Sequence, residues 1–252
     1  MTVATLRLRA LQVLLAVALI GAWHVLTAVG WLPPFFFGRP LQVGKRLVDW
    51  FVTGSVLPHL AVTLGETLLA FLFGTLAGIA CGLWLGVAAF AARLLDPWLK
   101  ALNAVPRVIL APIFAVWFGL GMASKVLLGI TLVFFVVFFA VFHGVRGTDP
   151  GILANARMLG ATRRGLLRHV YLPGALAWAF ASLHTAVGLA FVGAVVGEYL
   201  GSSRGIGYLI LQAEGEFDID TVLAGVILLT ICALVLDAAV SAGERRLLRW
   251  RP

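Results

Sequence analysis

Ionisable side chains are rare in the long apolar stretches of this sequence, so those that occur there are the first candidates for chemistry. They are Glu66, Arg107, His184, Glu198 and Asp237. Such groups are costly in hydrocarbon and usually face a polar interior or a partner. Glu66 and His184 lie deep in different stretches, and the sequence leaves open whether they pair with each other or contact a solute. Asp237 is expected to be an interfacial residue that Arg245 could neutralise.

The same residue types argue against an enzyme. The histidines are scattered and show no metal-ligand spacing: His24, His59, His143, His169 and His184. The sequence contains no G-x-x-x-x-G-K-[ST] phosphate loop, so any ATP must be hydrolysed by another chain. Cys81 and Cys232 both lie in apolar runs and give no disulfide framework. We expect no catalytic residue, no bound metal and no cofactor in this chain.

The composition places these residues in a membrane protein. The 252 residues are 62% hydrophobic and 12% charged, whereas a soluble domain is about 45–50% apolar and about 25% charged. The mean hydropathy of +1.04 excludes a water-soluble globule. The net charge of +8 is concentrated between apolar stretches, which is typical of membrane orientation rather than of nucleic-acid binding.

Runs of about 20 apolar residues can cross a bilayer as helices. We predict six: Leu11–Val29, Leu60–Ala88, Leu99–Phe118, Val126–His143, Gly174–Val196 and Thr221–Val240. The fold class is therefore an all-α integral membrane protein with about six transmembrane helices. Arg7 and Arg9 precede the first run as in a signal peptide, but the run is long and no clear A-x-A site follows, so we favour a retained anchor.

The distribution of Lys and Arg predicts the orientation. The segments then placed inside carry most of the basic residues: Arg7, Arg9, Arg93, Lys100, Arg146, Arg157, Arg163, Arg164, Arg168, Arg245, Arg246, Arg249 and Arg251. Both termini are therefore predicted to be cytoplasmic, in a bacterial inner membrane. We divide the chain into an anchor with a periplasmic amphipathic segment (1–57), a core (58–245) and a basic cytoplasmic tail (246–252).

Small residues and prolines mark two of the predicted spans. Four glycines recur at intervals of four residues in the second span and should line one helical face: Gly74, Gly78, Gly82 and Gly86. Such a face allows close helix packing in lipid. Pro106 and Pro112 should kink the third span. The stretch 38–52 has the spacing of an amphipathic helix lying at the membrane surface.

The longest inside segment, 147–173, predicts two short helices that meet at a glycine. Asp149 can cap the first helix, with Pro150 at its first position. Gly160 can adopt the left-handed conformation that ends it. Thr162 can cap the second, and Leu172-Pro173 opens the fifth span. From periodicity alone, this element either docks on a partner protein or lies flat on anionic lipid.

The loop resembles that of the permeases of bacterial ABC importers, and this favours docking. Ala154-Asn155-Ala156, three residues, Gly160, nine residues and Val170-Tyr171-Leu172-Pro173 match the intervals of that family's Glu-Ala-Ala pattern. Further segments are similar to its nitrate, sulfonate and taurine branch: Asp96-Pro97, Val105-Pro106, Ala111-Pro112-Ile113, Trp117-Phe118-Gly119-Leu120-Gly121, Lys125, Thr148-Asp149, Glu198 and Gly205-Ile206-Gly207.

The resemblance implies a type I importer permease fold and a set of partners. These are a second, identical permease, a dimer of ATPase subunits that binds ATP and magnesium, and a periplasmic solute-binding protein, all in contact with membrane lipid. It also implies an ATPase-coupling loop, with the residues Asp149, Ala154, Asn155, Ala156, Arg157, Gly160, Arg163, Leu172 and Pro173. For the translocation pathway we name Glu66, Pro106, His184 and Glu198.

Three positions depart from the family pattern. Ala154 replaces glutamate, which removes one charged contact from the loop. Glu66 and His184 stand where sulfonate permeases often have arginine, so an anionic solute would be repelled unless Glu66 is paired or protonated. The expected solute is a small sulfonate, taurine or nitrate-like compound, with a neutral or amine-containing metabolite left open. The alternative function is an ion-gradient-driven transporter or a channel without an ATPase partner.

Overall fold

The computed structural model describes residues 3–247, and all regular secondary structure in that part of the chain is helical. The helices are α1 (Val3–Ala28), α2 (Pro34–Phe37), α3 (Pro40–Val52), α4 (Leu57–Val87), α5 (Ala89–Ala104), η1 (Arg107–Ile109), α6 (Leu110–Phe118), α7 (Met122–Arg146), α8 (Pro150–Met158), α9 (Arg163–Leu166), η2 (Leu167–Tyr171), α10 (Leu172–Leu200), α11 (Ile206–Gly215) and α12 (Ile219–Leu247).

Five of the six predicted spans are confirmed as long apolar helices: α1, α4, α7, α10 and α12. The predicted span over 99–118 corresponds to a bent pair of helices, because this stretch begins inside α5 and breaks before α6, with a bend of 74° between the two arms. Counted together, the pair is a sixth apolar segment, and the kink expected at Pro106 is confirmed. Pro106 forces Val105 into an extended conformation and ends α5 there. Pro112 lies in the first turn of α6, where proline removes no intrahelical hydrogen bond.

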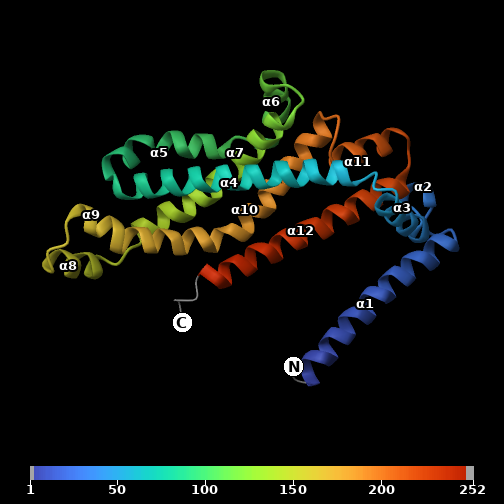
Figure 1. Ribbon diagram of the computed structural model, residues 1–252, viewed down its shortest axis with the longest axis horizontal. Helices are drawn as coiled ribbons and strands as arrows, with labels where there is room; N and C mark the ends of the chain where they lie inside the picture. The colour runs from blue at the N-terminus through green and yellow to red at the C-terminus, as the bar shows by residue number, and fades with distance from the viewer. Residues whose placement is uncertain (1–2, 248–252) are drawn as a thin grey trace.

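Helices α4, α7 and α10 form the centre of the molecule (Figure 1). Small side chains fill the space between them, with Ala70 of α4, Val133 and Val137 of α7 and Ala186 and Ala190 of α10 fully buried. Since lipid tails are as apolar as the helix surfaces, this close packing of small residues is what holds the helices together.

The glycines of α4 lie against a row of valines on α7. A Cβ atom built on Gly74, Gly78, Gly82 or Gly86 would come within 2.7 to 2.9 Å of Val133, Val137, Val141 or Val145, respectively. Carbon atoms in favourable contact are about 3.5–4.0 Å apart. The two backbones are therefore closer than any side chain on the glycine face would allow.

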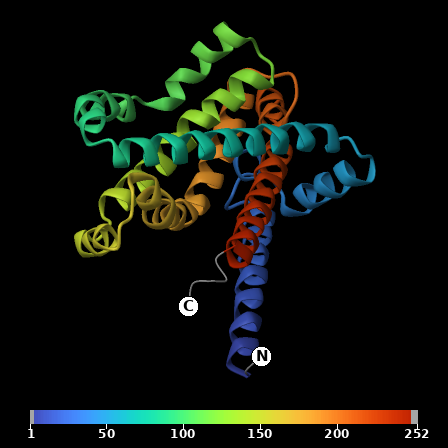
Figure 2. The same ribbon diagram turned by 60° about the vertical axis from the view of Figure 1, so that its left-hand side comes forward.

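The remaining helices surround this centre unevenly. Helix α12 packs on α11, α3 and one end of α10, and it diverges from α10 toward its own C-terminus (Figures 1 and 2). Helix α1 stands apart from the bundle in Figure 1, and only 6% of its most apolar stretch is buried. The end of the molecule that carries α8 and α9 is called the loop end below, and the end that carries α3 and α11 the opposite end.

Candidate functional site

At the loop end, the first short helix has the caps that the sequence predicts. The side chain of Asp149 accepts a hydrogen bond from the backbone N–H of Gly151 at 2.6 Å, and Pro150 is the first residue of α8. Gly160 has a φ of +83° and lies just after the helix. The helix–glycine geometry of the loop is therefore confirmed, while its contact with an ATPase stays a prediction.

Helix α8 has no buried residue. Ala154, Asn155 and Arg157 are exposed and Ala156 is half-buried. The apolar side chains Met158 and Leu159 are 78% and 88% exposed. This surface is apolar, rigidly capped and uncovered by the described part of the chain, which is typical of a docking element.

The second half of the loop differs from the prediction of a separate short helix. Thr162 accepts a hydrogen bond from the N–H of Gly165 at 3.2 Å and caps α9 as expected. From there α9, the π-helical turn η2 and α10 run on without a break, so that Arg163 to Leu200 is one helical segment. Arg163 is exposed, and Leu172 and Pro173 are half-buried at the start of α10, as predicted. Helix α8 joins this segment through the turn at 159–162.

At the opposite end, polar side chains from α4, α10 and α11 meet in the protein interior. Thr63 donates a hydrogen bond to Glu198 at 2.6 Å and accepts one from the backbone N–H of Ile206 at 3.0 Å. The second oxygen of Glu198 accepts the N–H of Gly207 at 2.8 Å. Thr63 and Glu198 are both completely buried. Thr63 and Glu198 therefore satisfy one free N–H group each at the start of α11 and fix that helix to the core.

Two more buried charged residues, Glu66 and Lys125, belong to this polar cluster. Each is 1% exposed. The ammonium of Lys125 donates to the carbonyl oxygen of Leu120, in the turn before α7. Oε2 of Glu66 has no hydrogen-bond partner. Lys125 thus brings a positive charge into the same buried region as the carboxyl groups of Glu66 and Glu198.

Two glycines make room for the Glu198 carboxylate. A Cβ atom on Gly205 would lie 2.1 Å from the carboxylate carbon, and one on Gly207 would lie 2.6 Å from the carbonyl oxygen of Val195. Gly205 also has a φ of +114°. Both positions therefore require glycine, for space and, at Gly205, for backbone conformation.

The pairing of Glu66 with His184 that the sequence left open does not occur. His184 lies on α10, and its two ring nitrogens face Asp237 Oδ1 at 2.7 Å and Glu244 Oε2 at 3.0 Å, both on α12. Asp237 therefore pairs with His184, while the side chain of Arg245, its expected partner, lies outside the described residues.

The four residues named for the pathway thus lie in three separate places. Glu66 and Glu198 are inside the polar cluster at the opposite end, and Pro106 lies at the break between α5 and α6. Of the four, His184 is the one that lines a described cavity, between α10 and α12. No group of three or more His, Cys, Asp or Glu side chains within the described residues could hold a metal ion.

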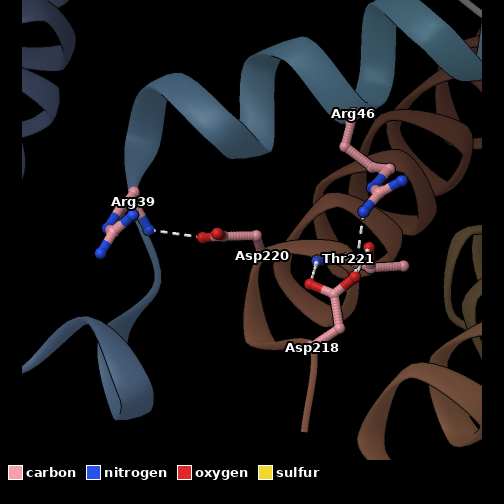
Figure 3. A network of polar contacts seen from close by, with 5 residues as sticks. All are labelled: Arg39, Arg46, Asp218, Asp220 and Thr221. Carbon is pink, nitrogen blue, oxygen red and sulfur yellow. Dashed lines mark hydrogen bonds and ion pairs between the residues drawn. The ribbon is translucent and has the colours of Figure 1, made fainter. Parts of the chain in front are cut away.

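A second set of polar contacts at the opposite end fixes the amphipathic segment to α12 (Figure 3). The guanidinium of Arg46 on α3 binds Asp218 at 3.0 Å, and the backbone N–H of Arg39 donates to Asp220 at 2.5 Å. Asp218 also accepts the N–H of Thr221 at 3.1 Å and so caps α12. Partial burial alone would raise the pKa of Asp218, but the hydrogen bonds from Thr221 and the charge of Arg46 outweigh it and lower this pKa.

Sequence reasoning did not find these two polar assemblies as units. The sequence singles out Glu66 and Glu198 as ionisable groups in apolar stretches and Lys125 only through the family resemblance, and it gives no prediction for Thr63. The available signal was the pair of glycines at 205 and 207, because a Gly-x-Gly motif before a helix often marks close approach of the backbone to another group.

Comparisons with known proteins agree with this architecture. The family model described as the binding-protein-dependent transport system inner membrane component matches residues 74–249. TauC, a taurine transport system permease protein of Escherichia coli, is 32% identical over 252 residues, covering 98% of this chain and 90% of TauC. A Bacillus subtilis protein, SsuC, described as an aliphatic sulfonates transport permease, is 32% identical and covers 94% of this chain and 86% of its own length.

Two further similarities bear on function and fold. ThiX of Halalkalibacterium halodurans, a formylaminopyrimidine transport permease protein, is 31% identical over 86% of this chain and 87% of ThiX. A chain in the structure of the MetNI methionine ABC transporter superposes with a TM-score of 0.65 at 20% identity, covering 78% of this chain and 96% of that one. The second likeness confirms the predicted all-helical type I permease fold.

Proposed function

We propose a function from one premise: this chain belongs to the family of inner membrane components of binding-protein-dependent transport systems. It is the transmembrane subunit of an ATP-driven importer. It moves a small solute from the periplasm to the cytoplasm by alternating access, and a separate pair of ATPase subunits drives the change between the two states.

The exposed helix α8 and the short turn that joins it to α9 and α10 support this proposal most directly. Movement of an ATPase subunit that holds α8 would act on a continuous helical segment from Arg163 to Leu200. The far end of that segment carries Glu198, which fixes α11. Closure of the ATPases at the loop end would thereby shift the opposite end, as alternating access requires.

The same proposal sets the orientation and the remaining partners. The loop end faces the cytoplasm, together with both termini, and α3 and α11 face the periplasm, where a solute-binding protein docks. A second copy of the chain completes the pathway. ATP and magnesium bind to the ATPase subunits. The solute belongs to the range that the relatives' names define, namely aliphatic sulfonates, taurine and formylaminopyrimidine.

Substitution of Gly160 tests the coupling role. Gly160→Val should abolish solute uptake, because its φ of +83° is strongly unfavourable for a β-branched residue. Gly160→Asn should retain much of the uptake, since Asn tolerates this conformation. No atom lies within 4 Å of a Cβ at this position, so the fold itself should survive both changes.

The measurements are uptake in cells and co-purification of the ATPase subunit with the permease, with membrane insertion as the check on folding. Gly165→Ala, five residues further along the loop, is the matched control, because a Cβ there meets Thr162 at an ordinary 3.5 Å. Normal uptake by Gly160→Val would contradict the coupling role. Purification of an active transporter without any ATPase would instead favour a channel or an ion-driven transporter.

A further inference from the structure

A cavity of about 260 Å³ lies between α10 and α12, where the two helices diverge. Its walls are mostly apolar and include Val187 and Phe191 of α10 and Leu234 and Leu236 of α12. His184 and Asp237 form its polar corner. The volume is close to the lower end of the range for small-molecule sites.

The polar corner is built to hold a positive charge. Carboxylates can only accept hydrogen bonds, and an imidazole donates from both nitrogens only as the imidazolium. His184 approaches Asp237 at 2.7 Å and Glu244 at 3.0 Å, so a single cation sits between two anionic groups. This arrangement attracts a second N–H-bearing group and repels an anion.

The corner is also accessible. The side chain of His184 is 38% exposed and that of Asp237 is 53% exposed. A bound amino group could therefore take the place of the imidazole at Asp237 without opening the packed core of α4, α7 and α10. The apolar walls would then contact the rest of the same molecule. Small-molecule sites usually combine a few polar groups, which orient the ligand, with mostly apolar walls.

Building on the transport function proposed above, we propose that this cavity binds the transported solute through an amino group, with Asp237 as the acceptor and the apolar walls around the rest of the molecule. The solute is accordingly an amine-bearing compound rather than a simple alkanesulfonate. Two solute chemistries share that group, a zwitterionic aminosulfonate and an aminopyrimidine.

Direct binding to the purified permease–ATPase complex tests the proposal. The complex is placed in lipid nanodiscs without nucleotide or binding protein, so that the selectivity of the binding protein has no influence. Saturation-transfer NMR then measures the dissociation constants of two matched pairs of probes. These are taurine against ethanesulfonate, and 4-aminopyrimidine against pyrimidine.

We expect the amino member of at least one pair to bind about tenfold or more tightly than its partner, which corresponds to one charge-assisted hydrogen bond. The pair that shows the preference identifies the solute chemistry. Asp237→Asn should remove the preference. Asp96→Asn, at an exposed carboxylate of α5 that pairs with Lys100, is the control and should keep it.

A second variant leaves the charges in place. Gly188 lines the cavity and has no atom within 4 Å of a built Cβ, so Gly188→Leu should fill the space without disturbing the helix contacts. It should weaken binding of the preferred probe, whereas Gly174→Leu, at an equally open position of α10, should not. Equal binding within both pairs, no binding by any probe, or a preference that survives Asp237→Asn would overturn the proposal. None of these results would affect ATPase co-purification or the Gly160 variants, on which the transport function is tested.

Discussion

The contact between the glycine face of α4 and the valine row of α7 allows a quantitative test at Gly86. All three atoms nearest to a Cβ at Gly86 belong to Val145, at 2.7, 2.7 and 3.3 Å. Forcing a methyl group into such a site costs about 1–3 kcal/mol. Gly65 on the same helix has only the flexible end of Met122 at 3.8 Å, so Gly65→Ala is the matched control.

We expect Gly86→Ala to be less stable than Gly65→Ala by about 1–3 kcal/mol in the free energy of unfolding. Both variants gain the same helix propensity over glycine, about 0.8–1.0 kcal/mol, and this gain cancels in the difference. The measurement is unfolding of the purified protein in detergent micelles with increasing SDS, followed by circular dichroism.

A double-mutant cycle with Val145→Gly isolates the contact. This change removes all three of the crowding atoms, so in its background Gly86→Ala should cost no more than Gly65→Ala, within about 0.5 kcal/mol. The coupling energy between the two positions should thus be about 1–3 kcal/mol. If Gly86→Ala proves as stable as Gly65→Ala in the wild-type background, the helices do not pack as closely as described here.

Three other outcomes follow from the sites. Gly205→Ala should detach α11 and reduce uptake strongly, because its Cβ would overlap the Glu198 carboxylate. Gly215→Ala, at a position with open space around it, should transport normally. Equal uptake by the two variants would refute the role of the polar cluster. Asp218→Ala should destabilise the protein at neutral pH by about 0.5–2 kcal/mol through the lost helix cap. Since folding lowers this pKa from 3.8, its contribution is present above that value and lost as the pH falls through the folded pKa, so thermal unfolding of variant and wild type should converge in acid. Leu159→Glu should weaken ATPase co-purification without affecting membrane insertion, because the side chain is 88% exposed; undiminished co-purification would place the ATPase elsewhere.

The sequence predicts those parts of the fold that depend on neighbouring residues. Hydropathy over a window located α1, α4, α7, α10 and α12, and the capping residues Asp149 and Thr162 located the short helices of the loop. Hydropathy also located the apolar stretch 99–118 but not the size of its bend, because hydropathy is insensitive to backbone direction. The apolar residues continue through Pro106, but the chain turns there.

The candidate sites depend on how each helix is rotated about its own axis, which hydropathy does not specify. His184 faces α12 rather than α4, and so its partners are Asp237 and Glu244. Glu66 faces the interior of the polar cluster, which includes residues more than 50 positions away in sequence, such as Lys125. Contacts between residues so far apart in sequence arise only from tertiary packing.

The uncovered surface of α8 also matters for the life of the protein in the cell. The side chains of Met158 and Leu159 form an apolar surface that is exposed to water, which is unfavourable. In the assembly proposed above, a copy made in excess of the ATPase would expose this surface continuously to chaperones and membrane proteases. That proposal implies that the supply of the ATPase subunit sets the abundance of the permease, with unassembled copies degraded.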